Sequence, residues 1–307
     1  MWGERQPTLL PMHHLTFWSI CAIWGTAFYL MRVASYHFGP IGVGGWRLAG
    51  GALLLALLWQ MRRRAWPLGR RDLPAVVLVA GCGYIWPFVM QPWLIGRNDN
   101  SSFFGMMVAL VPLLTIIVSI PLLGIRPTRR QLVGVLGALA LMVLLMREAD
   151  VLEIPLGDVA LAATVPLAYA ISNTFVKRRF PAVSPIALVG TVAGLSAMAI
   201  LPVSFATEPV RTEPTEGLLI AIAALAALGV LATGVAVSLF YRLIQQRGPL
   251  FAGMVTYVVP LIALGVGWLG DEPITPVQLI ALLGILAFVA LVQSDPRGTM
   301  GPPMRET

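Results

Sequence analysis

Charged residues are scarce along the whole chain. Only 11% of the 307 residues are Asp, Glu, Lys or Arg, whereas 58% are hydrophobic, and the mean hydropathy is +0.83. A soluble domain carries roughly 25% charged residues, because its surface must be solvated. The shortage extends over the full length of the chain rather than over one segment. It therefore excludes a soluble globular protein and indicates a polytopic membrane protein.

The sequence also lacks the motifs of several kinds of chemistry. It has no G-x-x-x-x-G-K-[ST] segment to bind ATP, no H-E-x-x-H or C-x-x-C spacing to bind a metal, and only 3 histidines. Its 2 cysteines, Cys21 and Cys82, each lie in an apolar run, so no disulfide framework is indicated. The net charge of +7 resides in short clusters between apolar runs, with no basic domain to hold a phosphate backbone. We expect no cofactor, no metal and no nucleic-acid partner.

What the chain does contain is a series of apolar runs of helix length. A helix needs roughly 20 residues to cross the hydrocarbon core of a bilayer. The runs cover residues 15–34, 41–61, 73–95, 101–123, 131–146, 156–175, 184–205, 218–244, 249–269 and 275–293. We therefore predict an all-α polytopic membrane protein with ten transmembrane helices, surrounded by a lipid bilayer.

Lysine and arginine predict the orientation of these helices, because cytoplasmic loops retain positive charge. If both termini are cytoplasmic, clusters such as Arg62–Arg64, Arg129–Arg130 and Lys177–Arg179 all fall on the cytoplasmic side. Only Arg32, Arg97, Arg147 and Arg211 fall on the other side. We predict an integral protein of the plasma membrane (the bacterial inner membrane), with a cytoplasmic N-terminus at residues 1–14 and a disordered cytoplasmic tail at residues 294–307.

Two phrases of the sequence resemble each other: VALVPLLTII at residues 108–117 and TYVVPLIALG at residues 256–265. Each places one proline in an apolar, helix-length run, and each is followed by a Thr-x-x-Gln capping box, from Thr128 and from Thr275. Five spans per half is an odd number, so the second copy must enter the membrane from the opposite side. We predict two inverted five-helix repeats, at residues 15–146 and 156–293, joined by an outer linker at 147–155. Such repeats recur in secondary transporters.

Three segments carry a family resemblance: AIWGTAFYLMR at residues 22–32, GWRLAGG around Arg47, and RLIQQRGPLFAGMVTYVVPLIALGVGWLGDEPITPVQ at residues 242–278. In order and spacing they resemble the drug/metabolite transporter superfamily, specifically its EamA-type ten-helix branch. The resemblance implies ten helices, cytoplasmic termini and transport of small metabolites, often the export of amino acids or related compounds. Glu272 matches the acidic residue of the family in the second half, whereas the corresponding first-half turn, LGIRPTRR, is basic.

Arg47 is a charged residue inside the second predicted span. An arginine in the bilayer costs about 2.5 to 3.5 kcal/mol on insertion scales, so it should face a wet cavity or a partner. One interpretation is an anion hook for a substrate carboxylate. The other is a structural arginine that either snorkels outward or binds carbonyls and a carboxylate such as Asp158 or Glu272. Asp158 itself is either a proton-coupling group or a charge that favours the positive N-terminus of the sixth helix.

Polar and amphipathic side chains of the first, third, sixth and ninth spans are candidates for one central substrate site. With Arg47 the predicted set is Trp24, Tyr29, Tyr84, Gln91, Tyr169, Asn173, Thr256 and Tyr257. Pro112 and Pro260 each leave a backbone carbonyl without a donor and are candidate hinges. Glu272 is a gating candidate, with a role in fixing its turn as the alternative. Because Tyr and Trp are also common at membrane interfaces, packing roles for the aromatic residues stay open.

These features predict a secondary transporter rather than an enzyme. We expect an exporter of a small amphipathic metabolite, such as an amino acid, that works by alternating access. Two alternatives are a membrane-embedded lipid-processing enzyme, which would need a nucleophile, a metal cluster or paired carboxylates, and a non-transporting assembly subunit. The G-x-x-x-G pair of Gly190 and Gly194 leaves both packing within the monomer and a homodimer open.

Overall fold

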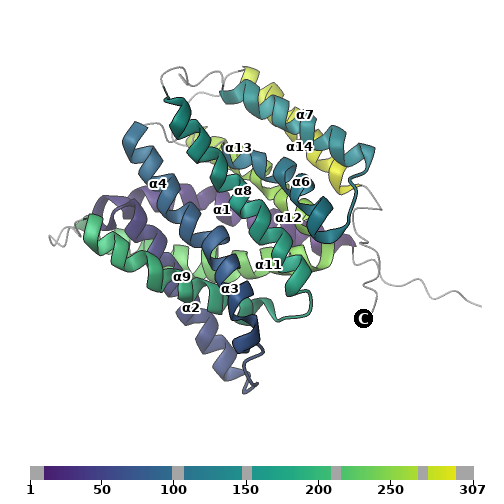
Figure 1. Ribbon diagram of the computed structural model, residues 1–307. Helices are drawn as coiled ribbons and strands as arrows, with labels where there is room; N and C mark the ends of the chain where they lie inside the picture. Colours follow the sequence, from purple (N-terminus) through teal and green to yellow (C-terminus); the bar gives the residue numbers. More distant parts are fainter. Residues whose placement is uncertain (1–9, 99–106, 147–153, 209–215, 269–275, 295–307) are drawn as a thin grey trace, which may run out of the picture.

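The computed structural model describes residues 10–98, 107–146, 154–208, 216–268 and 276–294, which are helical almost throughout (Figure 1). The first half contains α1 (Leu10–Phe38), α2 (Pro40–Met61), η1 (Arg70–Asp72), α3 (Leu73–Ala80), η2 (Gly81–Ile85), α4 (Trp86–Asn98), η3 (Met107–Leu110), α6 (Val111–Leu123) and α7 (Arg129–Met146). The second half contains α8 (Leu156–Arg179), α9 (Pro185–Thr207), α10 (Glu216–Ala227), η4 (Leu228–Val235), α11 (Ala236–Arg247), α12 (Pro249–Gly253), α13 (Val255–Trp268) and α14 (Pro276–Gln293).

Several of the described helices suit a bilayer by length and composition. Residues 40–61, 70–91, 156–179, 185–207 and 217–247 form helices long and apolar enough to cross a membrane, and shorter apolar helices cover 107–123, 249–262 and 279–293. In lipid every backbone polar group must be satisfied within the protein, which a helix does through its own hydrogen bonds. The all-helical, apolar architecture of the described residues confirms the predicted all-α membrane class.

The two halves pack through matching pairs of helices. α2 lies against α9, and α7 lies against α14 at one edge of the molecule (Figure 1). α1 packs on α13, just as α8, the first helix of the second half, packs on α6. α1 also contacts α10 and α11, as α8 contacts α3 and α4. Each of these helices of one half thus contacts the same helices of the other half as its counterpart does. Two similar repeats produce this pattern when they are related by a two-fold axis.

Both halves interrupt their third long helix with a π-helical segment. η2 separates α3 from α4, and η4 separates α10 from α11. A π-helical turn moves each hydrogen bond by one residue and frees backbone groups for other partners. The Trp24 Nε1 donates to the Ala232 carbonyl inside η4 at 2.9 Å, and the Ser172 Oγ donates to the Val79 carbonyl next to η2 at 3.3 Å. Each donor comes from the opposite half, so both segments join the two repeats.

Glycines allow close approach of the helices at this junction. A Cβ on Gly229 of η4 would lie 3.3 Å from the Cα of Gly50, so the backbones of η4 and α2 are in contact. Gly190 and Gly194 of α9 both face α2, where an added Cβ would meet side chains at 3.4 Å and 3.7 Å. The G-x-x-x-G pair therefore packs the two repeats within one chain. A homodimer stays a prediction.

The capping box at the start of α7 is confirmed. The Thr128 N donates to the Gln131 Oε1 at 3.1 Å, and the Gln131 N donates back to the Thr128 Oγ1 at 3.2 Å. Its counterpart at Thr275 lies outside the described residues, as do Glu272, most of the outer linker, residues 1–9 and the tail from residue 295.

The two candidate hinge prolines occupy different helix positions. Pro112 lies in the first turn of α6, directly after the 3-10 segment η3, and so within a continuous apolar helix over Met107–Leu123. Pro260 lies inside α13, where it cannot donate to the Thr256 carbonyl four residues earlier. A hinge role stays a prediction for both.

Two glycines of η2 provide a matched test of this packing. A Cβ on Gly83 would lie 2.5 Å from the Ser172 Oγ, whereas a Cβ on Gly81 would meet nothing within 4 Å. We expect Gly83→Ala to reduce stability by about 1 to 3 kcal/mol through overpacking. We expect Gly81→Ala to be neutral or slightly stabilising, because alanine restricts the unfolded chain. Thermal unfolding of both variants in detergent measures the difference, and equal unfolding temperatures would contradict the described packing.

Candidate substrate site

The guanidinium of Arg47 lies at the junction of α2 and η4. Arg47 is only 8% exposed. Its Nε donates to the Thr233 Oγ1 at 3.2 Å, and its Nη1 donates to the Met31 Sδ at 3.3 Å. The Arg47 Cζ also lies 5.4 Å from the centroid of the Phe88 ring, within the range of a cation–π interaction. All three of these contacts are neutral groups, so none of them balances the charge.

Tyrosines gather around this guanidinium. Tyr84 of η2 and Tyr169 of α8 both lie within electrostatic range of Arg47. The Tyr84 ring stacks on the Phe88 ring at a centroid distance of 6.1 Å and an interplanar angle of 22°. Tyr241 of α11 is buried, and its hydroxyl lies beside the hydroxyl groups of Tyr84 and Ser172.

Two further aromatic side chains complete the group. The centroids of the Trp24 ring of α1 and the Phe240 ring of α11 lie 5.1 Å apart. The same Trp24 ring donates the hydrogen bond to η4 that was described above. We define the Arg47 cluster as Arg47, Trp24, Tyr84, Phe88, Tyr169, Thr233, Phe240 and Tyr241. It combines one cation, several hydroxyl groups and flat apolar surfaces, and its members come from both repeats.

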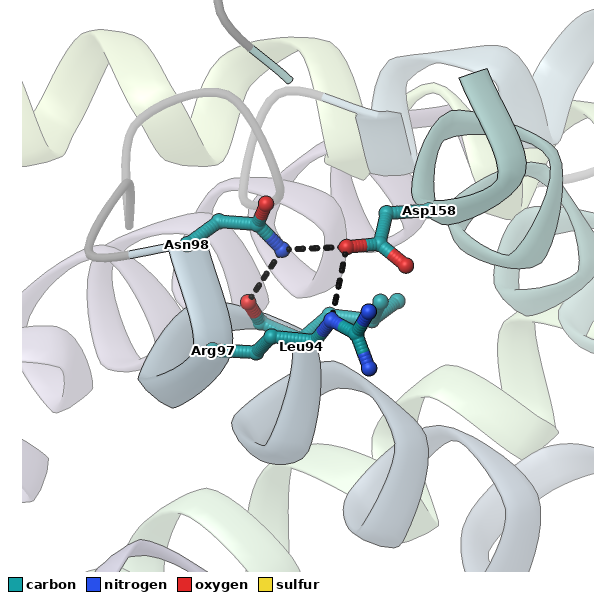
Figure 2. Close-up of polar contacts among 4 residues, drawn as sticks. All are labelled: Leu94, Arg97, Asn98 and Asp158. Carbon is teal, nitrogen blue, oxygen red and sulfur yellow. Dashed lines mark hydrogen bonds and ion pairs between the residues drawn. The ribbon is translucent and has the colours of Figure 1, made fainter. Parts of the chain in front are cut away.

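Asp158 does not pair with Arg47. The Arg97 Nε lies 3.2 Å from the Asp158 Oδ2, and the Asn98 Nδ2 donates to the same oxygen at 2.9 Å (Figure 2). The Asn98 Nδ2 also donates to the Leu94 carbonyl at 3.0 Å, which holds the amide in place (Figure 2). Asp158 also lies in the first turn of α8, where the helix dipole favours a negative charge. The interpretation of Asp158 as the partner of Arg47 is therefore wrong.

The other acidic side chains that the structure describes are also paired elsewhere. Glu208 accepts hydrogen bonds from the backbone N–H groups of Ile41 at 3.0 Å and Gly42 at 2.8 Å, at the N-terminus of α2. Asp72 forms an ion pair with Arg179 at 3.2 Å. Within the described part of the chain, Arg47 therefore lacks a carboxylate partner.

The structure places several predicted site residues outside the Arg47 cluster. Tyr29 is 62% exposed, because five residues along a helix turn its side chain by about 140° from that of Trp24. The Tyr257 hydroxyl donates to the Val135 carbonyl of α7 at 3.1 Å, and the Thr256 hydroxyl donates to the Gly253 carbonyl of its own segment at 2.9 Å. The ninth span thus contributes packing contacts. Gln91 is half-buried on α4, and Asn173 is buried on α8.

Four members of the cluster were not predicted as site residues: Phe88, Thr233, Phe240 and Tyr241. Thr233 and Tyr241 carried a usable signal, because each is a polar group in the otherwise apolar eighth span. Phe88 and Phe240 carried none, because phenylalanine is ordinary in a membrane helix. Their common feature is proximity to the π-helical segments, which hydropathy does not reveal.

A helical bundle of two similar repeats, with a buried polar cluster where they meet, is the architecture of membrane transporters. The chain belongs to the EamA-like transporter family, whose family profile matches residues 13–147 and again residues 157–294. The match to both halves confirms the predicted family and its two-repeat organisation.

Individual relatives agree with this assignment. The chain is similar to the inner membrane transporter YedA of Escherichia coli (strain K12), with 27% identity over 293 residues that cover 92% of this chain and 90% of the relative. It is also similar to the transporter YoaV of Bacillus subtilis (strain 168), with 23% identity over 254 residues, or 82% and 86% of the two chains. One solved crystal structure has the same fold, with a TM-score of 0.73, 19% identity and coverage of 92% and 96%.

Among the described residues Arg47 has no carboxylate partner, and this predicts an unusual stability effect. Even a complete buried ion pair can often be replaced by apolar residues of similar volume with a neutral effect or a gain of about 1 to 4 kcal/mol, and a cation without a carboxylate partner has less attraction to lose. We therefore expect Arg47→Met to unfold at the same or a higher temperature than the wild type when no solute is added. Arg97→Met should lower stability by about 1 to 2 kcal/mol, because Asp158 stays buried with only Asn98 as a partner. Thermal unfolding in detergent compares the two variants, and a large loss for Arg47→Met would show that this arginine has a structural partner.

Proposed function

We propose that the protein is a secondary carrier that exports a small amphipathic metabolite across the inner membrane and binds it at the Arg47 cluster. The observation that carries the proposal is the position of this cluster. A cation and several aromatic side chains lie buried at the junction of two repeats, in a chain that belongs to a family of transporters. A buried, charge-bearing group between repeats is where carriers of this architecture bind their solute.

The topology that fits this proposal has ten membrane-spanning helices in two inverted repeats, with both termini in the cytoplasm. The distribution of lysine and arginine supports it, and so does the exchange of equivalent contacts, in which α1 packs on α13 as α8 packs on α6. In this orientation the end of the bundle with Arg97 and Glu208 faces outward, and the end with Asp72 and Arg179 faces the cytoplasm.

Polar contacts between the repeats at the two ends suit alternating access. The outer contacts are the Arg97–Asp158 ion pair and the bonds of Glu208 to the N-terminus of α2; the inner contact is the Asp72–Arg179 ion pair. Each joins a residue of the first repeat to one of the second. A carrier must break the contacts at one end while it keeps those at the other. Pro112, Pro260 and Glu272 remain candidates for hinge and gating residues in this motion.

Two tyrosines of different exposure allow a matched transport test. Tyr241 is buried in the cluster, whereas Tyr29 is 62% exposed on the surface of the bundle. A hydroxyl that bonds a charged solute contributes about 1.5 to 3 kcal/mol, so we expect Tyr241→Phe to slow transport roughly tenfold or more. Tyr29→Phe should leave the rate unchanged. Both variants are reconstituted in liposomes and assayed for uptake of a mixed panel of amino acids, organic acids, nucleosides and cationic drugs.

Protein-free liposomes provide the background, and the assay is repeated with and without an imposed proton gradient to separate coupled transport from exchange. Accumulation of one class of compound by the wild type alone supports the carrier. If folded wild type moves nothing from the panel, the carrier proposal fails and a non-transporting assembly role takes its place. If a panel compound is chemically altered, the protein is an enzyme instead.

A further inference from the structure

We infer that the solute is an organic anion: a small carboxylate that carries an aromatic or bulky apolar group and needs no ammonium group. The inference rests on the proposed function of the Arg47 cluster as the substrate site. It specifies that the solute is negatively charged, and it predicts that simple carboxylates bind better than amino acids.

The negative charge of the proposed solute is inferred from the acidic residues that the structure describes, because none of them pairs with Arg47. A guanidinium stays protonated under all ordinary conditions, so its burial has to be offset by an anion or by many hydrogen bonds. Among the described residues, the side-chain hydrogen bonds of Arg47 go to one hydroxyl and one thioether sulfur. Asp72, Asp158 and Glu208, the acidic side chains that the structure describes, are each held by other partners. A carboxylate that reaches Arg47 would gain the strong, two-pronged hydrogen bonding that the planar guanidinium favours.

Hydroxyl groups beside the guanidinium suit the same ligand. Tyr84 and Tyr169 lie within electrostatic range of Arg47. The buried hydroxyl of Tyr241 lies beside the hydroxyls of Tyr84 and Ser172, so it belongs to a group of hydroxyls that can reorient toward an anion. A carboxylate accepts several hydrogen bonds at once, so it satisfies both the cation and a nearby hydroxyl.

The cluster offers an ammonium group few favourable interactions. The cluster already contains the positive charge of Arg47, which disfavours a second cation in a medium of low dielectric constant. The carbonyls of Ala232 and Val79 at the π-helical segments already accept bonds from Trp24 and Ser172. An amino acid therefore loses the hydration of its ammonium without a matching gain, and a purely cationic compound is disfavoured twice.

The aromatic side chains indicate the remainder of the solute. The Phe88 ring lies under the guanidinium and nearly parallel to the Tyr84 ring, and the Trp24 and Phe240 rings contact each other nearby. Flat apolar surfaces favour offset or edge-on contact with another ring. A carboxylate attached to a ring matches both parts of the cluster.

Three probes with the same phenyl ring test the inference: phenylacetate, phenylalanine and phenethylamine, which are an anion, a zwitterion and a cation at neutral pH. Binding to the full chain in detergent is measured by isothermal titration calorimetry and by the shift in unfolding temperature. We expect phenylacetate to bind at least tenfold more tightly than phenylalanine and phenethylamine to show no binding. Arg47→Gln should weaken phenylacetate binding at least tenfold, Arg47→Lys should weaken it less, and the exposed-site control Arg242→Gln should leave it unchanged.

Equal or tighter binding of phenethylamine, or phenylacetate binding that survives Arg47→Gln, would overturn the inference. Failure of all three probes to bind the folded wild type would overturn it as well. The carrier proposal is judged separately by the mixed uptake panel. A protein that transports an amino acid or a cation and is indifferent to Arg47→Gln remains a carrier, but not an anion carrier.

Discussion

A cation enclosed by the protein without a carboxylate partner is costly, and among the residues that the structure describes Arg47 is such a cation, where the two repeats meet. Arg47 reaches the junction of α2 and η4 because Gly50 and Gly229 let the two backbones touch. The neutral groups around it, Thr233, Met31 and the Phe88 ring, reduce the cost of burial without removing the charge. A site of this kind gains stability when an anion arrives, which is the differential interaction that a ligand needs in order to change a conformational equilibrium.

The π-helical segments η2 and η4 connect this centre to the rest of the fold. Each frees backbone groups in one repeat for a side chain of the other, as the bonds of Trp24 and Ser172 show. The segments also carry or adjoin members of the cluster: Tyr84 lies in η2, Thr233 lies in η4 and Phe240 lies in the adjoining α11. The proposed binding site at Arg47 therefore lies where each repeat is irregular, and irregular helix turns are frequent at functional sites.

The positions of the helices could be predicted from the sequence better than the side of each helix that faces the centre of the bundle. Helix positions followed from apolar run length and from the clusters of basic residues, and the capping box at Thr128 followed from one local pattern. Arg47 was identified because a charge in a membrane helix is expensive wherever it points. Tyr29 and Tyr257 were predicted to join it, but one is exposed and the other bonds to α7. A span that is apolar all round has no polar stripe, so nothing in its pattern shows which side faces the centre. The π-helical segments depend on tertiary contacts that hydropathy does not show, so the sequence could mark Thr233 and Tyr241 as polar groups but could not place them beside Arg47.

The central claim is that the repeats open at one end while they stay joined at the other, around the Arg47 cluster. Electron–electron distance measurement tests it most directly, with Cys21 and Cys82 replaced by serine and spin labels placed at exposed positions. One label pair replaces Trp93 and Leu156 at the outer end, and a second pair replaces Arg71 and Arg178 at the inner end. Alternate opening predicts that Arg97→Gln lengthens the outer distance and not the inner one, and that Arg179→Gln does the reverse. Distances that stay fixed in both variants, or that lengthen together at both ends, would contradict it.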